Sequence, residues 1–264
     1  IALGGAVLIN AQETPKASPT PQEAVKPADE EKDKKSKDDK KEDKKPEKPA
    51  PVDPKNPTAE QVAETVVVIY GNNVAGRQVL NQIRKTAIER GKTNFTNADG
   101  TVEKVNYEKR ILRGDNFDKE KIRYDQESPS TKYALIFNDN KVVGVFNETV
   151  FTPRDDASKA FQNQLWHGID ALLRYKENGA TIKLDGREKF MGNEYHILEL
   201  TDKENRKTRY FISTKTYKVM WLEYKDGDVK YTRRFYDYRY AQGTLVPYRS
   251  VLFANDKQVE ETQI

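Results

Sequence analysis

From about Lys92 to the C-terminus the sequence alternates with the period of two that is typical of β-strands, and this pattern leaves few choices of fold. Turn sequences recur about every ten residues along it. Because a short turn joins strands that are neighbours in a sheet, the sequence predicts a largely antiparallel β-meander. Four turns carry the Asn, Asp and Gly residues that hairpins favour: residues 97–100, 138–140, 191–193 and 226–227.

The meander is expected to contain about eleven strands, and a sheet of that length twists and curls. It therefore acquires a concave face. We expect a mainly β (α+β) domain built on this curled sheet. The predicted strands are residues 101–112, 119–126, 132–138, 142–147, 180–187, 194–202, 207–213, 218–225, 229–240, 244–254 and 259 onward.

Two helices, or one broken helix, are predicted before the sheet. Thr58-Ala-Glu-Gln61 has the spacing of a capping box, and an apolar run at helical spacing follows it as far as Tyr70. A second helix is predicted from Val74 to Arg90. Gly91 follows it at the position where a left-handed residue often ends a helix.

One further helix is predicted in the middle of the meander, over residues 157–178. Asp155 and Asp156 precede it, where negative charge stabilises a helix start, and Gly179 ends it. The simplest place for this helix is the concave face of the sheet, where it fills the space or covers a cavity. Its apolar stripe consists of Phe161, Leu165, Ile169 and Leu172, widened by Trp166 and Leu173.

The first 57 residues contain too few apolar side chains to join a core. Residues 1–12 are apolar but too short to span a bilayer, and we interpret them as the remnant of a signal peptide cleaved near Ala11 or Gln12; a frayed tail is the alternative. Residues 13–57, rich in Pro, Lys, Glu and Asp, are predicted to be a disordered tether. It is either a spacer in the cell envelope or a linker without a specific role.

Charge and composition argue against several classes of function. Nine Lys balance nine acidic residues between positions 28 and 50, so the net charge of +4 belongs to the predicted domain, residues 58–264. This excess is too small for a typical nucleic-acid-binding surface. The chain has no cysteine, which excludes thiolate chemistry, cysteine-bound zinc and a lipobox anchor.

The sequence also contains no recognisable catalytic or metal-binding motif. His167 and His196, the two histidines, lack a further histidine or carboxylate at ligand spacing, and there is no glycine-rich phosphate loop or Gly-x-Ser-x-Gly elbow. Glu260 and Glu261 are adjacent on a predicted strand, so their side chains point to opposite faces. We expect no metal, no cofactor and no enzymatic activity, although a Ser-His-Asp triad of distant residues stays open.

Aromatic residues are frequent in the predicted domain, and two interpretations of them are open. The 14 Tyr, 10 Phe and 2 Trp form either an ordinary core or a stacking surface for glycan or nucleic acid, as the Arg-rich stretch 231–240 would suit. Export makes nucleic acid an unsuitable partner.

Three consecutive strand motifs stand out in the C-terminal half. They are Gly192-Asn-Glu-Tyr-His-Ile-Leu-Glu-Leu200, Thr208-Arg-Tyr-Phe-Ile-Ser-Thr-Lys-Thr-Tyr217 and Phe235-Tyr-Asp-Tyr-Arg-Tyr-Ala-Gln-Gly-Thr-Leu-Val-Pro-Tyr248. Near the N-terminus, a helix with Asn72-Asn73 and Ile83 leads to Gly91 and the first strand. Together these features resemble the outer-membrane lipoprotein-sorting proteins, the LolA-like superfamily, over residues 58–264.

The resemblance implies an unclosed β-barrel, covered by helices, whose apolar concavity receives acyl chains of lipoproteins or lipids. It implies a monomeric periplasmic carrier or sensor in a Gram-negative-type envelope, working with inner- and outer-membrane lipoprotein machinery. Carriers of the family use an arginine that latches the helical cover, and no arginine of this chain can be aligned with it. The chain ends in mid-strand at Ile264, so we expect a final strand or helix beyond it.

We expect the ligand to lie between the sheet and the central helix. Release would need no chemistry, because a helix shift that exposes apolar surface costs about 25 cal/mol per Å². The alternative is an envelope structural or interaction protein that binds protein or glycan; a cavity of roughly several hundred Å³ beneath the helix would favour the carrier. The expected lining residues are Leu135, Phe137, Val143, Val145, Phe161, Leu165, Leu198, Leu200, Phe211 and Trp221.

Overall fold

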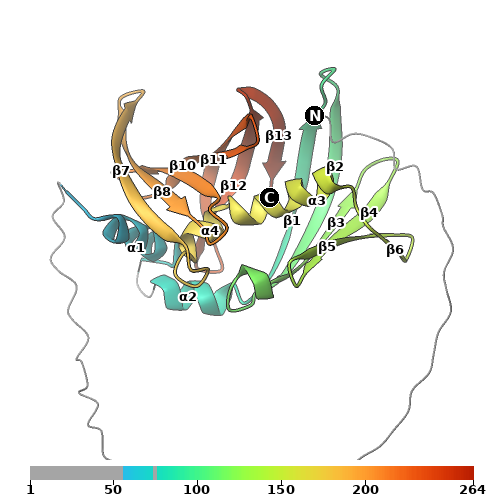
Figure 1. Ribbon diagram of the computed structural model, residues 1–264, viewed down its shortest axis with the longest axis horizontal. Coiled ribbons are helices and arrows are strands. Elements are labelled where there is room, and N and C mark those ends of the chain that lie inside the picture. Colours follow the sequence, from blue (N-terminus) through green and yellow to red (C-terminus); the bar gives the residue numbers. More distant parts are fainter. Residues whose placement is uncertain (1–55, 74–75) are drawn as a thin grey trace, which may run out of the picture. The chain divides into compact units, whose positions relative to one another are not determined.

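Thirteen strands form one antiparallel sheet in the computed structural model, which describes residues 56–73 and 76–264 (Figure 1). Their order is β6-β5-β4-β3-β2-β1-β13-β12-β11-β10-β9-β8-β7, so two meanders meet where the first strand pairs with the last. The strands are β1 (Thr86–Thr96), β2 (Val102–Leu112), β3 (Lys121–Glu127), β4 (Lys132–Asn138), β5 (Lys141–Phe146), β6 (Thr149–Phe151), β7 (Thr181–Phe190), β8 (Asn193–Thr201), β9 (Lys207–Ser213), β10 (Val219–Asp226), β11 (Val229–Ala241), β12 (Thr244–Ala254) and β13 (Lys257–Gln263).

The sheet curls without closing, because β6 and β7 lie at its two edges among the described strands. Helices α3 (Asp155–Trp166) and α4 (Ile169–Leu173) cross the hollow of the curled sheet (Figure 1). The mainly β, antiparallel and unclosed architecture predicted from the sequence is thus confirmed. The sheet has thirteen strands rather than eleven, since β1 and the three-residue β6 were not predicted.

Helix α1 (Ala59–Tyr70) begins as predicted. Thr58 is its N-cap: the Gln61 amide donates to the Thr58 hydroxyl at 3.2 Å, and the Thr58 amide donates to the Gln61 side chain at 2.9 Å. The capping box is therefore confirmed. Capping satisfies amides that have no partner within the helix and fixes the start of the first element in the described part of the chain.

The second predicted helix is wrong over its C-terminal half. Helix α2 (Gly76–Ile83) is short, and residues 86–96 form strand β1, which pairs with β2 along its full length. Ile88, which lies within the predicted helix, is 61% exposed. Hydrogen bonding to β2 and β13 in the tertiary structure outweighs the local helical spacing.

Gly91 lies inside β1 and does not cap a helix. A Cβ atom at this position would lie 2.2 Å from the carbonyl oxygen of Gln263 and 2.7 Å from the hydroxyl of Tyr107. The glycine is therefore required because a neighbouring backbone and an aromatic side chain approach it closely.

The predicted central helix is two helices. It begins at Asp155, two residues before the predicted start, and breaks between Trp166 and Ile169. At the break, a Cβ on Gly168 would lie 2.7 Å from the carbonyl oxygen of Gln164. The glycine thus permits the change of direction between α3 and α4, which a continuous apolar stripe did not reveal.

Two buried clusters lie on the concave side. The larger one joins α1 and α4 to β8–β12 and includes Val66, Tyr70, Leu172, Leu198, Tyr210 and Leu222. The second joins α3 to β2–β4 and consists of Tyr107, Ile122, Tyr124, Leu135, Phe137, Phe161 and Leu165. Helix α3 thus buries its apolar face against one meander, and α1 and α4 bury theirs against the other.

The predicted signal-peptide remnant lies outside the described residues, as does the predicted tether except for its last two positions. Within the part of the chain that the structure describes, every helix is too short or too polar to cross a bilayer.

Candidate functional site

A cleft of about 1040 Å³ lies where the two meanders meet, against the junction of α3 and α4. Its walls come from β1 and β2 on one side and from β11, β12 and β13 on the other, while Leu165, Ile169 and Asp170 reach it from the helices. A volume of this size accommodates a lipid or drug-sized ligand. A second recess, beside Trp166 and Arg206, measures only about 30 Å³ and has room for little more than a water molecule.

One wall of the cleft is aromatic and aliphatic. Tyr107, Ile122 and Tyr124 of β2 and β3 line it together with Leu165 of α3. The rings of Tyr107 and Tyr124 lie 5.4 Å apart, and Tyr124 stacks on Phe161 at 5.9 Å. Residues that pair in the register share a face of the sheet, and Ile122 and Tyr124 pair with Ile111 and Lys109. Tyr107 lies on the same face because it is two positions before Lys109 on β2. These packed rings and aliphatic side chains give this wall of the cleft an apolar surface.

The end of the cleft near α4 is charged. Asp170 pairs with Arg84 at 2.9 Å and also with Arg113. Beside them Arg174 donates to Glu120 at 2.7 Å and to the Gly114 carbonyl oxygen at 2.6 Å. Both partners of the Arg174–Glu120 pair are at least nine-tenths buried, so each charge is compensated locally.

The pKa values at this end reflect burial and charge together. Burial raises the pKa of Asp170, but Arg113, Arg84 and Arg174 outweigh it and hold the pKa at about 2. Burial raises the pKa of Glu120, because Arg174 offsets only part of that effect. The carboxylate of Asp170 is thus ionised at neutral pH and anchors α4 between guanidinium groups.

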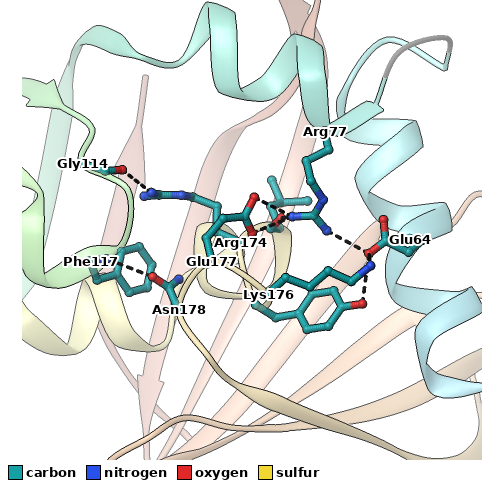
Figure 2. Close-up of polar contacts among 10 residues, drawn as sticks. Glu64, Arg77, Gly114, Phe117, Arg174, Lys176, Glu177 and Asn178 are labelled. Carbon is teal, nitrogen blue, oxygen red and sulfur yellow. Dashed lines mark hydrogen bonds and ion pairs between the residues drawn. The ribbon is translucent and has the colours of Figure 1, made fainter. Parts of the chain in front are cut away.

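A polar network holds the turn after α4 against the N-terminal helices (Figure 2). Arg77 of α2 donates to Glu177 at 2.7 Å, to Glu64 of α1 at 2.9 Å and to the Leu173 carbonyl oxygen at 3.0 Å. Across the turn, Asn178 accepts a hydrogen bond of 2.9 Å from the Phe117 amide. The same turn therefore contacts both N-terminal helices and the β2–β3 connection.

Six of the ten predicted lining residues lie on the concave side. Leu135, Phe137, Phe161 and Leu165 belong to the cluster under α3, and Leu198 and Leu200 belong to the cluster under α1 and α4. The structure brings them together as two packed cores rather than as one lining. Among the six, only Leu165 is on the wall of the cleft.

The other four predicted lining residues lie on the opposite face of the sheet. Phe211 pairs with Trp221 in the register and packs in a separate cluster, whereas their neighbours Tyr210 and Leu222 face the helices. On β5 the inward-facing positions are Val142 and Gly144, which pair with Phe137 and Leu135 of β4. Val143 and Val145 alternate with these positions and therefore face outward. An error of one position in strand phase reverses the face, which removes these residues from the lining.

Apart from Leu165, the residues that form the cleft were missed. The period-two pattern of residues 101–112 places Tyr107, Lys109 and Ile111 on one face and could have identified them. Arg113 and Asp170 could not be found this way, because their proximity depends on how α4 docks on the end of β2.

Neither histidine is on the cleft wall. His167 is buried, with Nδ1 2.7 Å from the Thr208 hydroxyl and its ring stacked on Tyr224 at 4.0 Å. His196 is buried within β8. Glu260 and Glu261 point to opposite faces as predicted, since they pair with Arg233 and Arg249, each at 2.7 Å. In the described residues no group of three or more acidic or histidine side chains could hold a metal ion.

No family model matches the sequence, and no curated protein matches it. Solved structures do. A LolA superfamily protein from Nitrosomonas europaea has a TM-score of 0.54 at 12% identity, over 78% of this chain and 90% of that one. A protein of the DUF1329 family from Desulfovibrio piger has a TM-score of 0.53 at 12% identity, with the same coverage of 78% and 90%.

A third similar structure is a protein domain from Vibrio parahaemolyticus whose name refers to outer-membrane lipoprotein sorting. Its TM-score is 0.51 at 15% identity, over 76% of this chain and 90% of that one. At such low identity the likeness concerns the fold. The chain therefore has the fold of the LolA-like superfamily, as its sequence motifs indicated.

Proposed function

We propose that the chain is a periplasmic carrier or sensor that binds acyl chains of lipoproteins or lipids in the cleft at the junction of the two meanders. The observation that carries this proposal is the volume of about 1040 Å³ beside the wall of Tyr107, Ile122, Tyr124 and Leu165. A filled interior would have left room only for a structural role. The likeness to LolA-like structures supports the same function.

Binding in this cleft needs no cofactor and no catalytic group. Apolar burial supplies the free energy, about 25 cal/mol per Å², and a shift of α3 and α4 that exposes the same surface weakens binding. We therefore propose a non-enzymatic monomer whose apolar segment at residues 1–12 directs its export. Residues 13–57 would form a spacer before the binding domain. The monomer would exchange its ligand with lipoprotein machinery at either membrane.

Purification from cell envelopes tests the proposal. Native mass spectrometry of the full chain should detect a co-purifying lipid or lipoprotein, and the stripped protein should bind cis-parinaric acid with an increase in fluorescence. Absence of any bound lipid together with no fluorescence change would overturn the proposal.

An envelope interaction protein is the second candidate, and one observation favours it. At the β7–β8 hairpin Phe190 and Met191 are 41% and 85% exposed, and the Phe190 ring lies 5.9 Å from Trp221, beside the buried outer-face cluster of Tyr195, Ile197 and Phe211. Such a surface suits a protein or glycan partner. If Trp221→Ala abolishes retention on purified envelope glycan or protein while cis-parinaric acid does not bind, this second function replaces the first.

A further inference from the structure

Arg113 has hydrogen-bonding capacity that the fold does not use. Its side chain is only 7% exposed and pairs with Asp170 through Nη2. Its Nε–H is buried and has no hydrogen-bond partner among the described residues. A buried donor without a partner is costly, and in proteins it commonly marks a place where a water, ion or ligand belongs.

Lys109 brings a second cation to the same cleft. It lies on the concave face of β2, and its ammonium forms no ion pair within 4.0 Å in the described part of the chain. Glu89 lies opposite Lys109 in the register, but its carboxylate accepts a hydrogen bond of 2.8 Å from the Tyr107 hydroxyl. Lys109 and Arg113 both line the cleft, Lys109 on β2 and Arg113 directly after the end of this strand.

This end of the cleft has an excess of positive charge. Four cationic side chains meet three carboxylates there: Arg84, Lys109, Arg113 and Arg174 against Glu89, Glu120 and Asp170. Partial burial strengthens the effect of an uncompensated charge because water screens it less. The apolar wall of Tyr107, Ile122 and Tyr124 begins on the same strands, next to the charges.

We infer that this end of the cleft binds the anionic headgroup of an amphiphile, with Lys109 and Arg113 on a carboxylate or phosphate and the hydrocarbon along the tyrosine wall. The inference rests on the proposed function and narrows it: the preferred ligand is an acidic lipid rather than an uncharged acyl chain. An Arg side chain suits planar carboxylate and phosphate oxygens, and a Lys ammonium adds a mobile point charge.

Two probes that differ in charge and by a single methyl group test this inference. The full chain, stripped of lipid, is titrated with cis-parinaric acid and with its methyl ester. The acid should bind at least about tenfold more tightly than the ester, because the ester offers no charge to the two cations. Lys109→Gln should remove most of this preference. Arg113→Lys, which keeps the charge but lacks the Nε–H, should remove part of it.

Lys104→Gln is the matched control. Lys104 lies on β2 like Lys109, but on the opposite, exposed face, so its loss should leave the preference for the acid intact. Thermal unfolding of each variant verifies that the fold is retained; Lys109 has no ion pair to lose, so its variant should keep the melting temperature of the parent.

The outcomes separate this inference from the proposed function. Equal affinity for acid and ester overturns the headgroup site and leaves the carrier function standing. Failure of both probes overturns the carrier function and the headgroup site with it. If neither probe binds and calorimetry detects binding of inorganic phosphate that Lys109→Gln abolishes, the site takes a free anion and the amphiphile assignment is wrong.

Discussion

His167 shows how one buried residue makes the stability of this fold depend on pH. Burial lowers its pKa to about 4 from an ordinary value of 6.5, and the nearby Arg206 adds to the effect. The folded protein therefore keeps the imidazole neutral, whereas the unfolded chain takes up a proton below pH 6.5. The stability contributed by this residue is complete above that pH and is lost as the pH falls toward 4.

We predict that the free energy of unfolding falls by about 2 kcal/mol from His167 alone between pH 6.5 and pH 5. Urea denaturation at both values measures it. His167→Phe keeps the stacking on Tyr224 but cannot titrate, so its stability should change correspondingly less. Burial also lowers the pKa of His196. This residue is present in both proteins, so its contribution to the pH dependence of stability cancels in the comparison. Equal pH slopes for the two proteins would contradict the prediction.

At the residue scale the sequence was informative where a local rule decides the outcome. The Thr58 capping box and the opposite directions of Glu260 and Glu261 depend on spacing alone, and both were predicted. Lining residues were harder, since Val143 and Phe211 satisfy the composition of a cavity wall but are out of phase with it by one position. Strand phase depends on register with a neighbour, which composition does not reveal.

At the scale of elements, Arg77 connects three segments through side-chain contacts (Figure 2). Its side chain is 24% exposed, and its guanidinium bonds to α1, to the end of α4 and to the turn beyond it. A charge with several hydrogen-bond partners in a partly buried place contributes more than an exposed ion pair does.

Arg77→Met should therefore lower the free energy of unfolding by about 1–3 kcal/mol. Arg90→Met is the control, because Arg90 is 70% exposed and pairs only with Glu108 among the described carboxylates; it should cost less than about 0.5 kcal/mol. Chemical denaturation of both variants at neutral pH gives the comparison. Similar losses would mean that the network is no more than a set of surface ion pairs.

Elements with a clear period and a hairpin turn were predictable, as β4, β9 and β12 show by matching their predicted bounds. The failures have a common cause. Residues 86–91 carry apolar groups at helical spacing but form a strand because they pair with β2, while β13 pairs with the next residues of the same strand, 92–95. The break at Gly168 follows from how α4 docks. Both depend on tertiary contacts, which outweigh local propensity.

At the scale of the whole domain, the pairing of β1 with β13 turns two meanders into one sheet. The register runs from Lys92 opposite Gln263 to Phe95 opposite Glu260. The two strands come from opposite ends of the domain sequence, so no local pattern predicts their contact. The cleft lies over this junction, which is why the curled sheet could be predicted and the position of the cavity could not.

Gly91 tests the importance of the junction. Because an added methyl group would lie 2.2 Å from the Gln263 carbonyl oxygen, Gly91→Ala should force the strands apart and cost about 1–3 kcal/mol. Lys92→Ala, at the exposed neighbouring position of the same strand, should change stability by less than about 0.5 kcal/mol. Thermal unfolding measures both. An unaffected Gly91→Ala protein would show that the junction adapts without strain.

Binding of cis-parinaric acid to two tryptophan variants tests the carrier function most directly. Ile111 lines the cleft, whereas Leu112, next to it on β2, faces the other way and is 47% exposed. We expect Ile111→Trp to fill part of the cleft and weaken binding at least about tenfold, and Leu112→Trp to leave the affinity within about twofold of the parent. Binding that is unchanged by Ile111→Trp, or weakened equally by both variants, would contradict an acyl-binding site in this cleft.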